Sequence, residues 1–395
     1  MRKKDIKKYL VVLFIFFLVL GISIQTTAKE QKRALVEKKD TNLALEQGCK
    51  LVKGLKHVDI LNCEEGVISS LNLQEDLPVF ALDANANTQI RANLVQDAGN
   101  TGVGRKVVVV DTGYNYLHPE LSSSYLGGYD FVNNDNDPID DNGHGSHVAG
   151  LITADGINSN AKGVSPNTGI FAAKVLNSAG SGYFSDVIES IYWSVDGNDG
   201  IYGTSDDLNA DAISMSLGTS SPYTYKGYCD NVLPSLTNAI NYAVSKNVNV
   251  VSAAGNSGNA GISIPGCISN SITVGSVDGT DKIVSFSGRG KALDVVAPGV
   301  SLLSSWLGSS YVTASGTSMA TPVVSGTVAL IKYQHPTYTV TQVRNALIKT
   351  AKDLGKRGFD TSYGYGRVDA YSAVNYVGSN SSSGNGLGNN GKSPN

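Results

Sequence analysis

Three short segments of this sequence place a reactive side chain among small or flexible neighbours. Asp111 follows a run of four valines and precedes Thr112 and Gly113, so a carboxylate stands where an apolar strand is expected to end. His144 lies between two glycines at the start of an apolar helical segment, and Ser318 lies among small residues that open another. Each also has an ordinary explanation, because aspartates cap turns and serines cap helices.

Taken together, in the chain order Asp–His–Ser, the three residues are the parts of a nucleophilic triad. A hydroxyl is a weak nucleophile until an imidazole accepts its proton, and a carboxylate fixes the tautomer of that imidazole and stabilises its charge. The order differs from the His–Asp–Ser and Ser–Asp–His orders of two other serine hydrolase arrangements, and Ser318 is not in a G-x-S-x-G turn. A zinc site at His144 and His147 is the alternative, but the sequence offers no third ligand beside them. The remaining histidines are interpreted as ordinary turn or surface residues: His57, His118 and His335.

The elements that must position these residues alternate regularly from Lys106 onward. Near-continuous apolar runs predict strands at 107–110, 170–175, 212–215, 248–253 and 272–277, and helical segments are expected at 147–153, 186–195, 236–246 and 322–333. Strands that are apolar on both faces and alternate with helices indicate an α/β fold with a parallel sheet covered by helices on both faces. Ligands gather outside the carboxyl ends of such strands, where Asp111 stands. The earlier part is mixed, with a helix expected at 43–55 and strands at 67–73 and 79–82.

The three blocks resemble the signature segments of the subtilisin-like serine proteases, the subtilases, over residues 88–377. The resemblance implies a subtilisin-like parallel sheet preceded by a small α+β propeptide. It implies a serine endopeptidase in which Ser318 attacks the scissile carbonyl and His144 acts first as base and then as acid. Asp111 would orient His144. One departure is Ser146, where most subtilases have threonine, and the serine keeps the hydroxyl.

The same resemblance assigns an oxyanion donor and two substrate-binding edges. The segment that ends in Gly255-Asn256 is similar to the block that carries the oxyanion asparagine, so Asn256 and the backbone N–H of Ser318 would stabilise the tetrahedral intermediate. Two glycine-containing segments resemble the edges that pair with an extended polypeptide substrate: Ser216, Leu217 and Gly218 on one side, and Gly180, Ser181 and Gly182 on the other.

An acidic stretch at 130–138 supplies closely spaced oxygen ligands of the kind that calcium favours. It resembles a calcium loop of some subtilases, with four candidate ligands: Asp130, Asn133, Asp135 and Asp137. A solvated polar loop is the alternative. A second acidic insertion at 196–207 has a similar composition.

Composition and charge exclude several other classes. The 395 residues include 41% hydrophobic and 16% charged residues, which supports a large apolar core rather than a disordered chain. The formal net charge is −3 and no long basic run follows the N-terminus, so nucleic-acid binding is not expected. A basic head, an apolar run at 10–24 and small residues near Ala28 predict a secretory signal peptide, with an uncleaved membrane anchor as the alternative.

These features predict four regions: a signal peptide at 1–28, a propeptide at 29–86, a catalytic domain at 87–377 and a flexible Gly/Ser/Asn tail at 378–395. We expect the mature protein to be a secreted monomer that acts on polypeptides and has no stable membrane association. We expect its own propeptide to inhibit it. An even number of cysteines in an exported chain suggests disulfides, and the family resemblance predicts the pair Cys229–Cys267. The rival hypothesis is a catalytically idle binding protein on the same fold.

Overall fold

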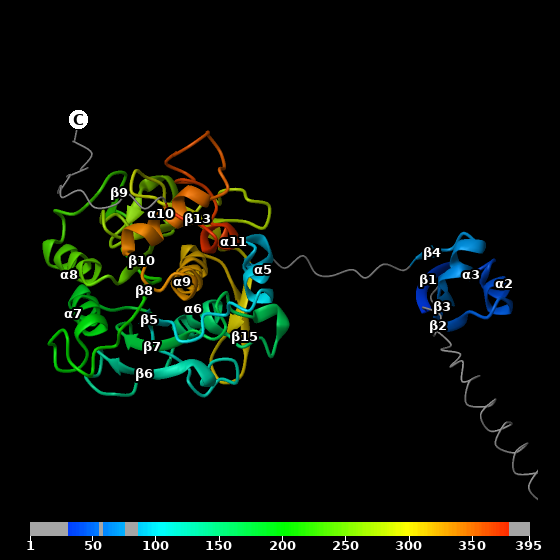
Figure 1. Ribbon diagram of the computed structural model, residues 1–395, viewed down its shortest axis with the longest axis horizontal. Coiled ribbons are helices and arrows are strands. Elements are labelled where there is room, and N and C mark those ends of the chain that lie inside the picture. The colour runs from blue at the N-terminus through cyan, green and yellow to red at the C-terminus, as the bar shows by residue number, and fades with distance from the viewer. Residues whose placement is uncertain (1–30, 55–57, 76–85, 379–395) are drawn as a thin grey trace, which may run out of the picture. The chain divides into compact units, whose positions relative to one another are not determined.

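The computed structural model describes residues 31–54, 58–75 and 86–378, in two compact units divided between Ala81 and Leu82 (Figure 1). The predicted signal peptide, the strand expected at 79–82, His57 and nearly all of the predicted tail lie outside the described residues. The domain boundaries proposed from the sequence therefore stay predictions.

The first unit is a small α+β fold. It contains β1 (Gln31–Glu37), α2 (Thr41–Glu46), β2 (Lys50–Gly54), β3 (Val58–Glu64), α3 (Glu65–Ser70) and β4 (Gln74–Glu75). The strands pair antiparallel in the order β2-β3-β1-β4. A small core that includes Val36 and Leu61 also holds the disulfide Cys49–Cys63.

Two sequence-based predictions for this unit are wrong. The helix expected at 43–55 ends at Glu46, and a strand begins at Lys50. The strand expected at 67–73 is largely helix α3, because Val67, Ile68 and Leu71 lie on the helix side that packs against the core. Spacings of one, three and four residues place side chains on one face of a helix, whereas a strand would direct them to both sides.

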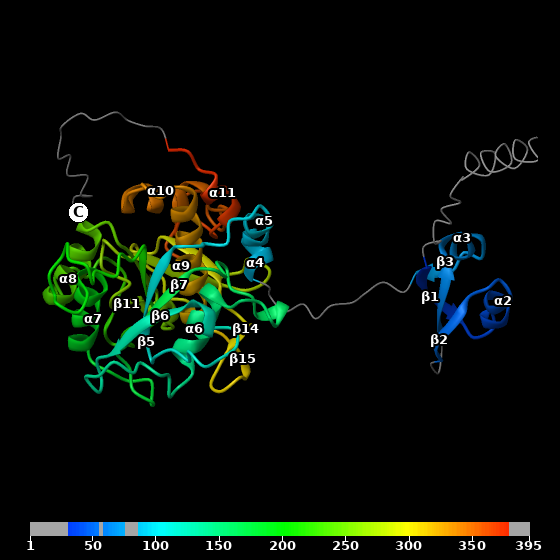
Figure 2. The ribbon, with the colours of Figure 1, turned by 60° about the horizontal axis from the view of Figure 1, so that its bottom comes forward.

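The second unit is built on a seven-stranded sheet in which every pairing is parallel, with the order β13-β12-β10-β8-β5-β7-β6 (Figure 2). Its strands are β5 (Lys106–Asp111), β6 (Tyr125–Asp130), β7 (Gly169–Lys174), β8 (Ala212–Met215), β10 (Asn249–Ala253), β12 (Ile272–Val277) and β13 (Val295–Pro298). The predicted parallel α/β sheet is confirmed. None of the expected strands corresponds to β6 or β13, which lie at the two edges of the sheet.

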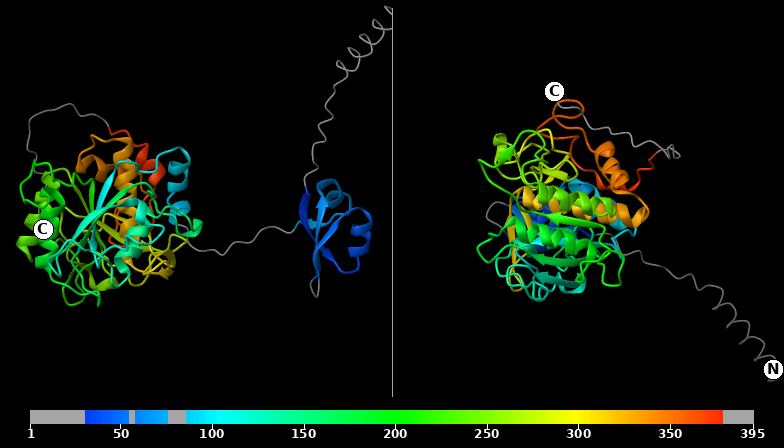
Figure 3. Two further views of the ribbon diagram at one scale, coloured as in Figure 1. Left: turned by 90° about the horizontal axis from the view of Figure 1, so that it is seen from below. Right: turned by 90° about the vertical axis from the view of Figure 1, so that its left-hand side faces the viewer.

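Helices cover both faces of this sheet, and β5 shows why (Figure 3). Val107 and Val109 pack into a core with α6 (His144–Thr153) and α9 (Thr317–Gln334), whereas Val108 and Val110 pack on the other side with α7 (Phe184–Asp196) and α8 (Pro234–Ser245). Successive side chains of a strand point to opposite faces, so a strand buried on both faces must be apolar throughout.

The remaining elements lie around this framework. They are α4 (Ala86–Gln89), α5 (Ala92–Asp97), α10 (Val340–Thr350), α11 (Ala370–Val374), the paired strands β9 (Thr224–Tyr225) and β11 (Ile262–Ser263), and the hairpin β14 (Leu302–Ser305) and β15 (Tyr311–Ala314). The hairpin leads directly into α9, so its position fixes the segment that carries Ser318.

Candidate active site

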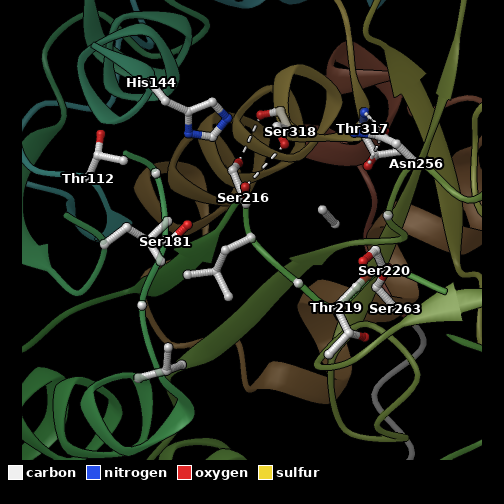
Figure 4. Close-up of a pocket in the computed structure, with 18 of the residues that line it drawn as sticks. Thr112, His144, Ser181, Ser216, Thr219, Ser220, Asn256, Ser263, Thr317 and Ser318 are labelled. Carbon is white, nitrogen blue, oxygen red and sulfur yellow. Dashed lines mark hydrogen bonds between the residues drawn. The ribbon is translucent and has the colours of Figure 1, made fainter. Parts of the chain in front are cut away.

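The carboxyl ends of the central strands open into a cleft of about 620 Å³ (Figure 4). Its lining includes His144, Ser318 and Asn256, which come from α6, α9 and the loop after β10. The predicted substrate-edge residues also line it: Ser216, Leu217, Gly218, Gly180, Ser181 and Gly182. The structure thus brings together residues that the sequence separates by more than 150 positions.

Asp111 lies behind His144 rather than in the cleft lining. Its side chain is fully buried, and its Oδ1 accepts hydrogen bonds from Nδ1 of His144 at 2.7 Å and from the backbone N–H of Thr112 at 2.7 Å. A donor at Nδ1 leaves Nε2 of His144 as the free basic nitrogen of the neutral ring. This is the tautomer that a general base needs.

Two glycines allow the turn after β5 to approach the first turn of α6. A Cβ on Gly145 would lie 2.2 Å from the carbonyl oxygen of Gly113, so only a residue without a side chain fits there. Gly113 has a φ of 124° and faces the backbone of Asp140, whose Cα would lie 2.9 Å from an added Cβ. These close contacts bring Asp111 within hydrogen-bonding distance of His144.

The surroundings of His144 raise its pKa above the ordinary value. Burial of the ring lowers the pKa, but the charge of Asp111, its hydrogen bond to Nδ1 and the charge of Asp140 together outweigh that effect. The neighbouring His147 behaves in the opposite way, because burial lowers its pKa to about 4. Its Nε2 lies 3.1 and 2.9 Å from the carbonyl oxygens of Leu302 and Val312, so His147 holds the β14–β15 hairpin.

Ser318 occupies the second position of α9, and its side chain faces the same part of the cleft as His144 (Figure 4). Its hydroxyl donates to the carbonyl oxygen of Ser216 at 3.1 Å, and the hydroxyl of Ser216 donates back to the carbonyl oxygen of Ser318 at 2.8 Å. The Ser318 hydroxyl therefore bonds to Ser216 rather than to His144 in this structure. Catalytic hydrogen bonds are often incompletely formed before substrate binds, and rotation about χ1 redirects a serine hydroxyl.

Asn256 is positioned by the residue that precedes Ser318. Its Oδ1 accepts hydrogen bonds from both the backbone N–H and the hydroxyl of Thr317, each at 3.0 Å. With Oδ1 occupied, Nδ2 is the group left to donate into the cleft. A Cβ added to Gly316 would lie 3.5 Å from Nδ2 of Asn256 and 3.6 Å from the backbone nitrogen of Ser318. Two donors thus border the same small space, as stabilisation of an oxyanion requires.

Comparison with known proteins agrees with this arrangement. Residues 102–366 match the model of the subtilase family. This chain belongs to the subtilase family. The family consists of serine endopeptidases, and the confirmed fold is the one that the resemblance implied.

Several named subtilases are similar to this chain. It is 40% identical over 274 residues to the thermophilic serine proteinase of Bacillus sp. (strain AK1), covering 69% of this chain and 62% of that protein. It is 39% identical over 287 residues to Subtilisin Savinase of Lederbergia lenta, covering 73% of this chain and 97% of that protein. Subtilisin J of Geobacillus stearothermophilus is 34% identical over 363 residues, 88% of each chain. The alignment thus spans less than two thirds of the Bacillus AK1 protein but nearly all of Subtilisin Savinase.

The four residues proposed as calcium ligands mainly cap their own turn. Asp130 is buried and accepts hydrogen bonds from the backbone of Val132 and Asn133 and from the Asn133 side chain. Asp135 accepts from the backbone of Asp137, and Asp137 accepts from Tyr116. Within the described ranges, no group of three or more His, Cys, Asp or Glu side chains is arranged to hold a metal ion. As arranged here, the four side chains do not form a common coordination sphere.

The sequence analysis missed two structural carboxylates, and it left the burial of one histidine open. His118 lies in a turn, as one of the two alternatives expected, but it is fully buried, and its Nε2 lies 3.0 Å from the carbonyl oxygen of Ser310. Glu120 is also fully buried, and its carboxylate accepts hydrogen bonds from three successive backbone N–H groups at 156–158 and from the hydroxyl of Tyr311. The second missed carboxylate is Asp140. No local pattern marks Glu120, because its partners lie in other segments, and the bond from Thr112 separates Asp140 from an ordinary turn cap.

One disulfide joins the two early cysteines, Cys49 and Cys63, and the other joins the two late cysteines, Cys229 and Cys267. Cys229 and Cys267 form the bond that the family resemblance predicted. The backbone N–H of Cys267 donates to the carbonyl of Ser263, which lines the cleft, and the N–H of Cys229 donates to the carbonyl of Cys267. The bond therefore lies directly behind one wall of the cleft.

Proposed function

We propose that this subtilase hydrolyses peptide bonds through an acyl-enzyme formed on Ser318. His144 removes the proton from the Ser318 hydroxyl as Oγ attacks the scissile carbonyl, and then gives that proton to the leaving amine. Asp111 keeps Nδ1 of His144 protonated and stabilises the imidazolium. Nδ2 of Asn256 and the backbone N–H of Ser318 stabilise the oxyanion, and water then hydrolyses the acyl-enzyme by the same steps. The observation that carries the proposal is the 2.7 Å Asp111–His144 bond at the edge of a cleft that also holds Ser318 and Asn256.

The substrate is an extended polypeptide lying between two exposed edges of the cleft. Residues 180–182 are exposed on one side, and Gly218 is exposed on the other. Backbone pairing along such edges binds a peptide largely independently of its side chains. The geometry therefore favours an endopeptidase over a hydrolase of small esters.

Replacement of Ser318 by alanine tests this proposal. Ser318→Ala should abolish hydrolysis of a chromogenic peptide and block covalent labelling by a sulfonyl fluoride. Ser315→Ala, a nearby serine outside the proposed machinery, should keep both activities within a few-fold. Hydrolysis that survives in Ser318→Ala would contradict the mechanism. Peptide binding without turnover in the unmodified chain would favour the idle binding protein instead.

We also propose that residues 29–86 act as a propeptide that inhibits the catalytic unit until it is cleaved. The support is the separate four-stranded unit and the similarity to Subtilisin J over 88% of each chain. A chain carrying Ser318→Ala should then accumulate as an uncleaved precursor, visible as an intact mass. Export is supported by the signal-like start of the sequence and by the two disulfides. No helix of the described ranges is long and apolar enough to cross a bilayer.

We also propose that the 130–138 loop binds calcium. Its support is the density of oxygen ligands and the resemblance to family calcium loops, although a cation would have to displace the turn-capping hydrogen bonds of Asp130. Calcium added to chelator-treated Ser318→Ala protein should raise its thermal midpoint, and Asp135→Asn should reduce that rise. An unchanged midpoint with and without calcium would reject the site.

A further inference from the structure

A second carboxylate, that of Asp140, lies next to the triad and is almost completely buried, with 5% of its surface exposed. Its Oδ1 accepts hydrogen bonds from the hydroxyl of Thr112 at 2.9 Å and from the backbone N–H groups of Asn142 and Gly143 at 3.0 and 2.9 Å. Its Oδ2 accepts from the backbone N–H and the hydroxyl of Ser146, at 2.8 and 2.6 Å. One buried side chain thus receives five hydrogen bonds.

These bonds connect the two segments that carry the catalytic acid–base pair. Thr112 follows Asp111, and its backbone N–H donates to Oδ1 of Asp111. The hydroxyl of Thr112 accepts from the backbone N–H of Gly145, next to His144, while it donates to Asp140. Asp140 therefore fixes the residue after Asp111 and also the first turn of α6, in which His144 lies.

The Ser146 hydroxyl extends this network to the segment before Ser318. It donates to Asp140 and accepts from the backbone N–H of Asn115. The side-chain amide of Asn115 in turn donates to the carbonyl oxygens of Trp306 and Gly308, in the turn of the β14–β15 hairpin. The hydroxyl that this chain keeps at Ser146 is thus part of a continuous hydrogen-bonded connection.

We propose that Asp140 is a positioning residue of the triad, which holds Asp111 and His144 in register and places a second negative charge behind the imidazole. The inference rests on the proposed protease activity. Asp140 does not touch substrate or the reacting atoms, and it acts through Thr112 and the start of α6.

The charge of Asp140 affects the pKa of His144, which a purely structural role would not predict. Among the described residues, the charged and titratable groups shown to interact with His144 are Asp111 from β5, Asp140 from the preceding loop and His147 from α6. Lys174 from β7 lies next to them, where it bonds to the carbonyl oxygen of Thr112 and to Asp141. Burial raises the pKa of Asp140, but the hydrogen bonds from Gly143, Ser146 and Asn142 outweigh this and lower it, so Asp140 is charged when His144 titrates. Its charge is one of the causes that raise the pKa of His144.

Asp141 provides a matched control for the charge. It is the next residue and has the same side chain, but its side chain is 49% exposed and is paired with the buried ammonium group of Lys174. Water screens a half-exposed carboxylate, and the charges that raise the pKa of His144 are those of Asp111 and Asp140. Loss of the Asp141 charge should therefore have little effect on the titration of His144.

The experiment compares Asp140→Asn, Asp140→Glu and Asp141→Asn in the full chain. Asp140→Asn should lower kcat by roughly tenfold to a hundredfold, because it replaces one acceptor oxygen by an amide and loosens the register. It should also move the acidic limb of the kcat/KM profile to lower pH by about half a unit, the effect of one charge at moderate effective dielectric. Asp140→Glu should lower kcat but leave the limb in place, and Asp141→Asn should leave the limb in place.

A second measurement does not depend on turnover or on processing. In the Ser318→Ala background, proton NMR titration of the His144 ring should show a lower pKa of His144 in Asp140→Asn, by the same amount as the acidic limb moves. The pKa of His144 should be unchanged in Asp141→Asn. If Asp140→Asn does not fold, as judged by circular dichroism, Asp140→Glu decides the positioning role: reduced kcat with an unmoved limb supports it, and unchanged kcat overturns it.

The failure of this inference is distinguishable from failure of the proposed function. A parent chain that cleaves peptide in a Ser318-dependent way, combined with an Asp140→Asn variant whose acidic limb and kcat are unchanged, overturns the inference alone. A parent chain without Ser318-dependent cleavage overturns the proposed protease mechanism, while the NMR titration still tests the electrostatic effect of Asp140 on His144.

Discussion

Asn256 accepts two hydrogen bonds from Thr317, and in the proposed mechanism it also donates one to the oxyanion, so substitutions can separate these roles. Nδ2 is placed to donate to the oxyanion, and Oδ1 accepts two hydrogen bonds from Thr317, each at 3.0 Å. Asn256→Ala removes all three. A hydrogen bond to a charged group contributes about 1.5–3 kcal/mol, which corresponds to roughly a tenfold to 150-fold change in rate.

Asn256→Ala also removes the acceptor of both Thr317 hydrogen bonds. Because Thr317 directly precedes Ser318, this loss loosens the position of the Ser318 backbone N–H. Each neutral hydrogen bond contributes about 0.5–1.5 kcal/mol, and part of this is lost as misplacement of the second oxyanion donor. If about half of the 1–3 kcal/mol from these two bonds is lost, the total is about 2–4.5 kcal/mol, and Asn256→Ala should lower kcat by roughly thirtyfold to two-thousandfold. KM should change by no more than about threefold, because the negative charge exists only in the transition state.

Two further variants distinguish the loss of the Nδ2 donor from the loss of the hydrogen bonds to Thr317. Asn256→Asp keeps an oxygen that accepts from Thr317 but loses the Nδ2 donor and places a negative charge beside the oxyanion, so its kcat should be lower than that of Asn256→Ala. Thr317→Val removes the hydroxyl and keeps the backbone N–H, so its kcat should fall only a few-fold. Steady-state kinetics on one peptide gives kcat and KM for each. A kcat for Asn256→Ala within fivefold of the parent, or a loss confined to KM, would refute the reasoning.

Three other changes have consequences that can be calculated from the structure, all measured in the Ser318→Ala background to prevent self-digestion. His147 is fully buried and its pKa is lowered to about 4, so the unfolded chain binds its proton first and stability is lost as pH falls from about 6.5 to 4, by roughly 3 kcal/mol. Urea unfolding at pH 7 and pH 4.5 should show a smaller loss in His147→Gln, and an equal loss would contradict this. Glu120→Ala leaves four donors without their acceptor and should lower the free energy of unfolding by about 3 kcal/mol, measured as a lower thermal midpoint; Glu120→Gln should lower it less, and an unchanged midpoint in both would count against the role. Alkylation without reduction should leave Cys229 and Cys267 unmodified, and their replacement by serine should cost about 2–4 kcal/mol; alkyl groups on both would show that the bond is absent.

The sequence was informative where function depends on local pattern. Asp111 could be placed because four valines before it predict a buried strand, and polar residues at the ends of parallel strands lie at the edge where ligands bind. His144 and Ser318 could be placed because small residues surround each of them at the start of a helix. The fold places each of these where expected, at the end of β5 and at the first residues of α6 and α9.

The early unit was harder to predict because its elements are short and its core is small. The segment at 43–55 begins with helix-forming residues, but the helix ends at Glu46, and Gly48 then adopts a φ of 92° before Cys49. Cys49, which is bonded to Cys63, directly precedes β2. Tertiary pairing with β3, not local propensity, determines the conformation of residues 50–54.

Three buried aspartates show that residue type alone does not determine the role of a side chain. Asp111, Asp130 and Asp140 are all almost fully buried. The Asp130 side chain accepts hydrogen bonds from Val132 and Asn133 in its own turn, a pattern typical of a turn cap. Asp140 also bonds two and three residues ahead, but it reaches Thr112 as well, 28 positions earlier.

That long-range contact is what separates a turn cap from a residue that positions catalytic groups. Both oxygens of Asp140 have donors, and the cost of leaving a buried oxygen unsatisfied favours keeping the donor segments together. Where those segments carry a base and its orienting acid, the same requirement fixes the active-site geometry. Buried carboxylates that bridge catalytic segments are therefore the residues to test after the triad itself.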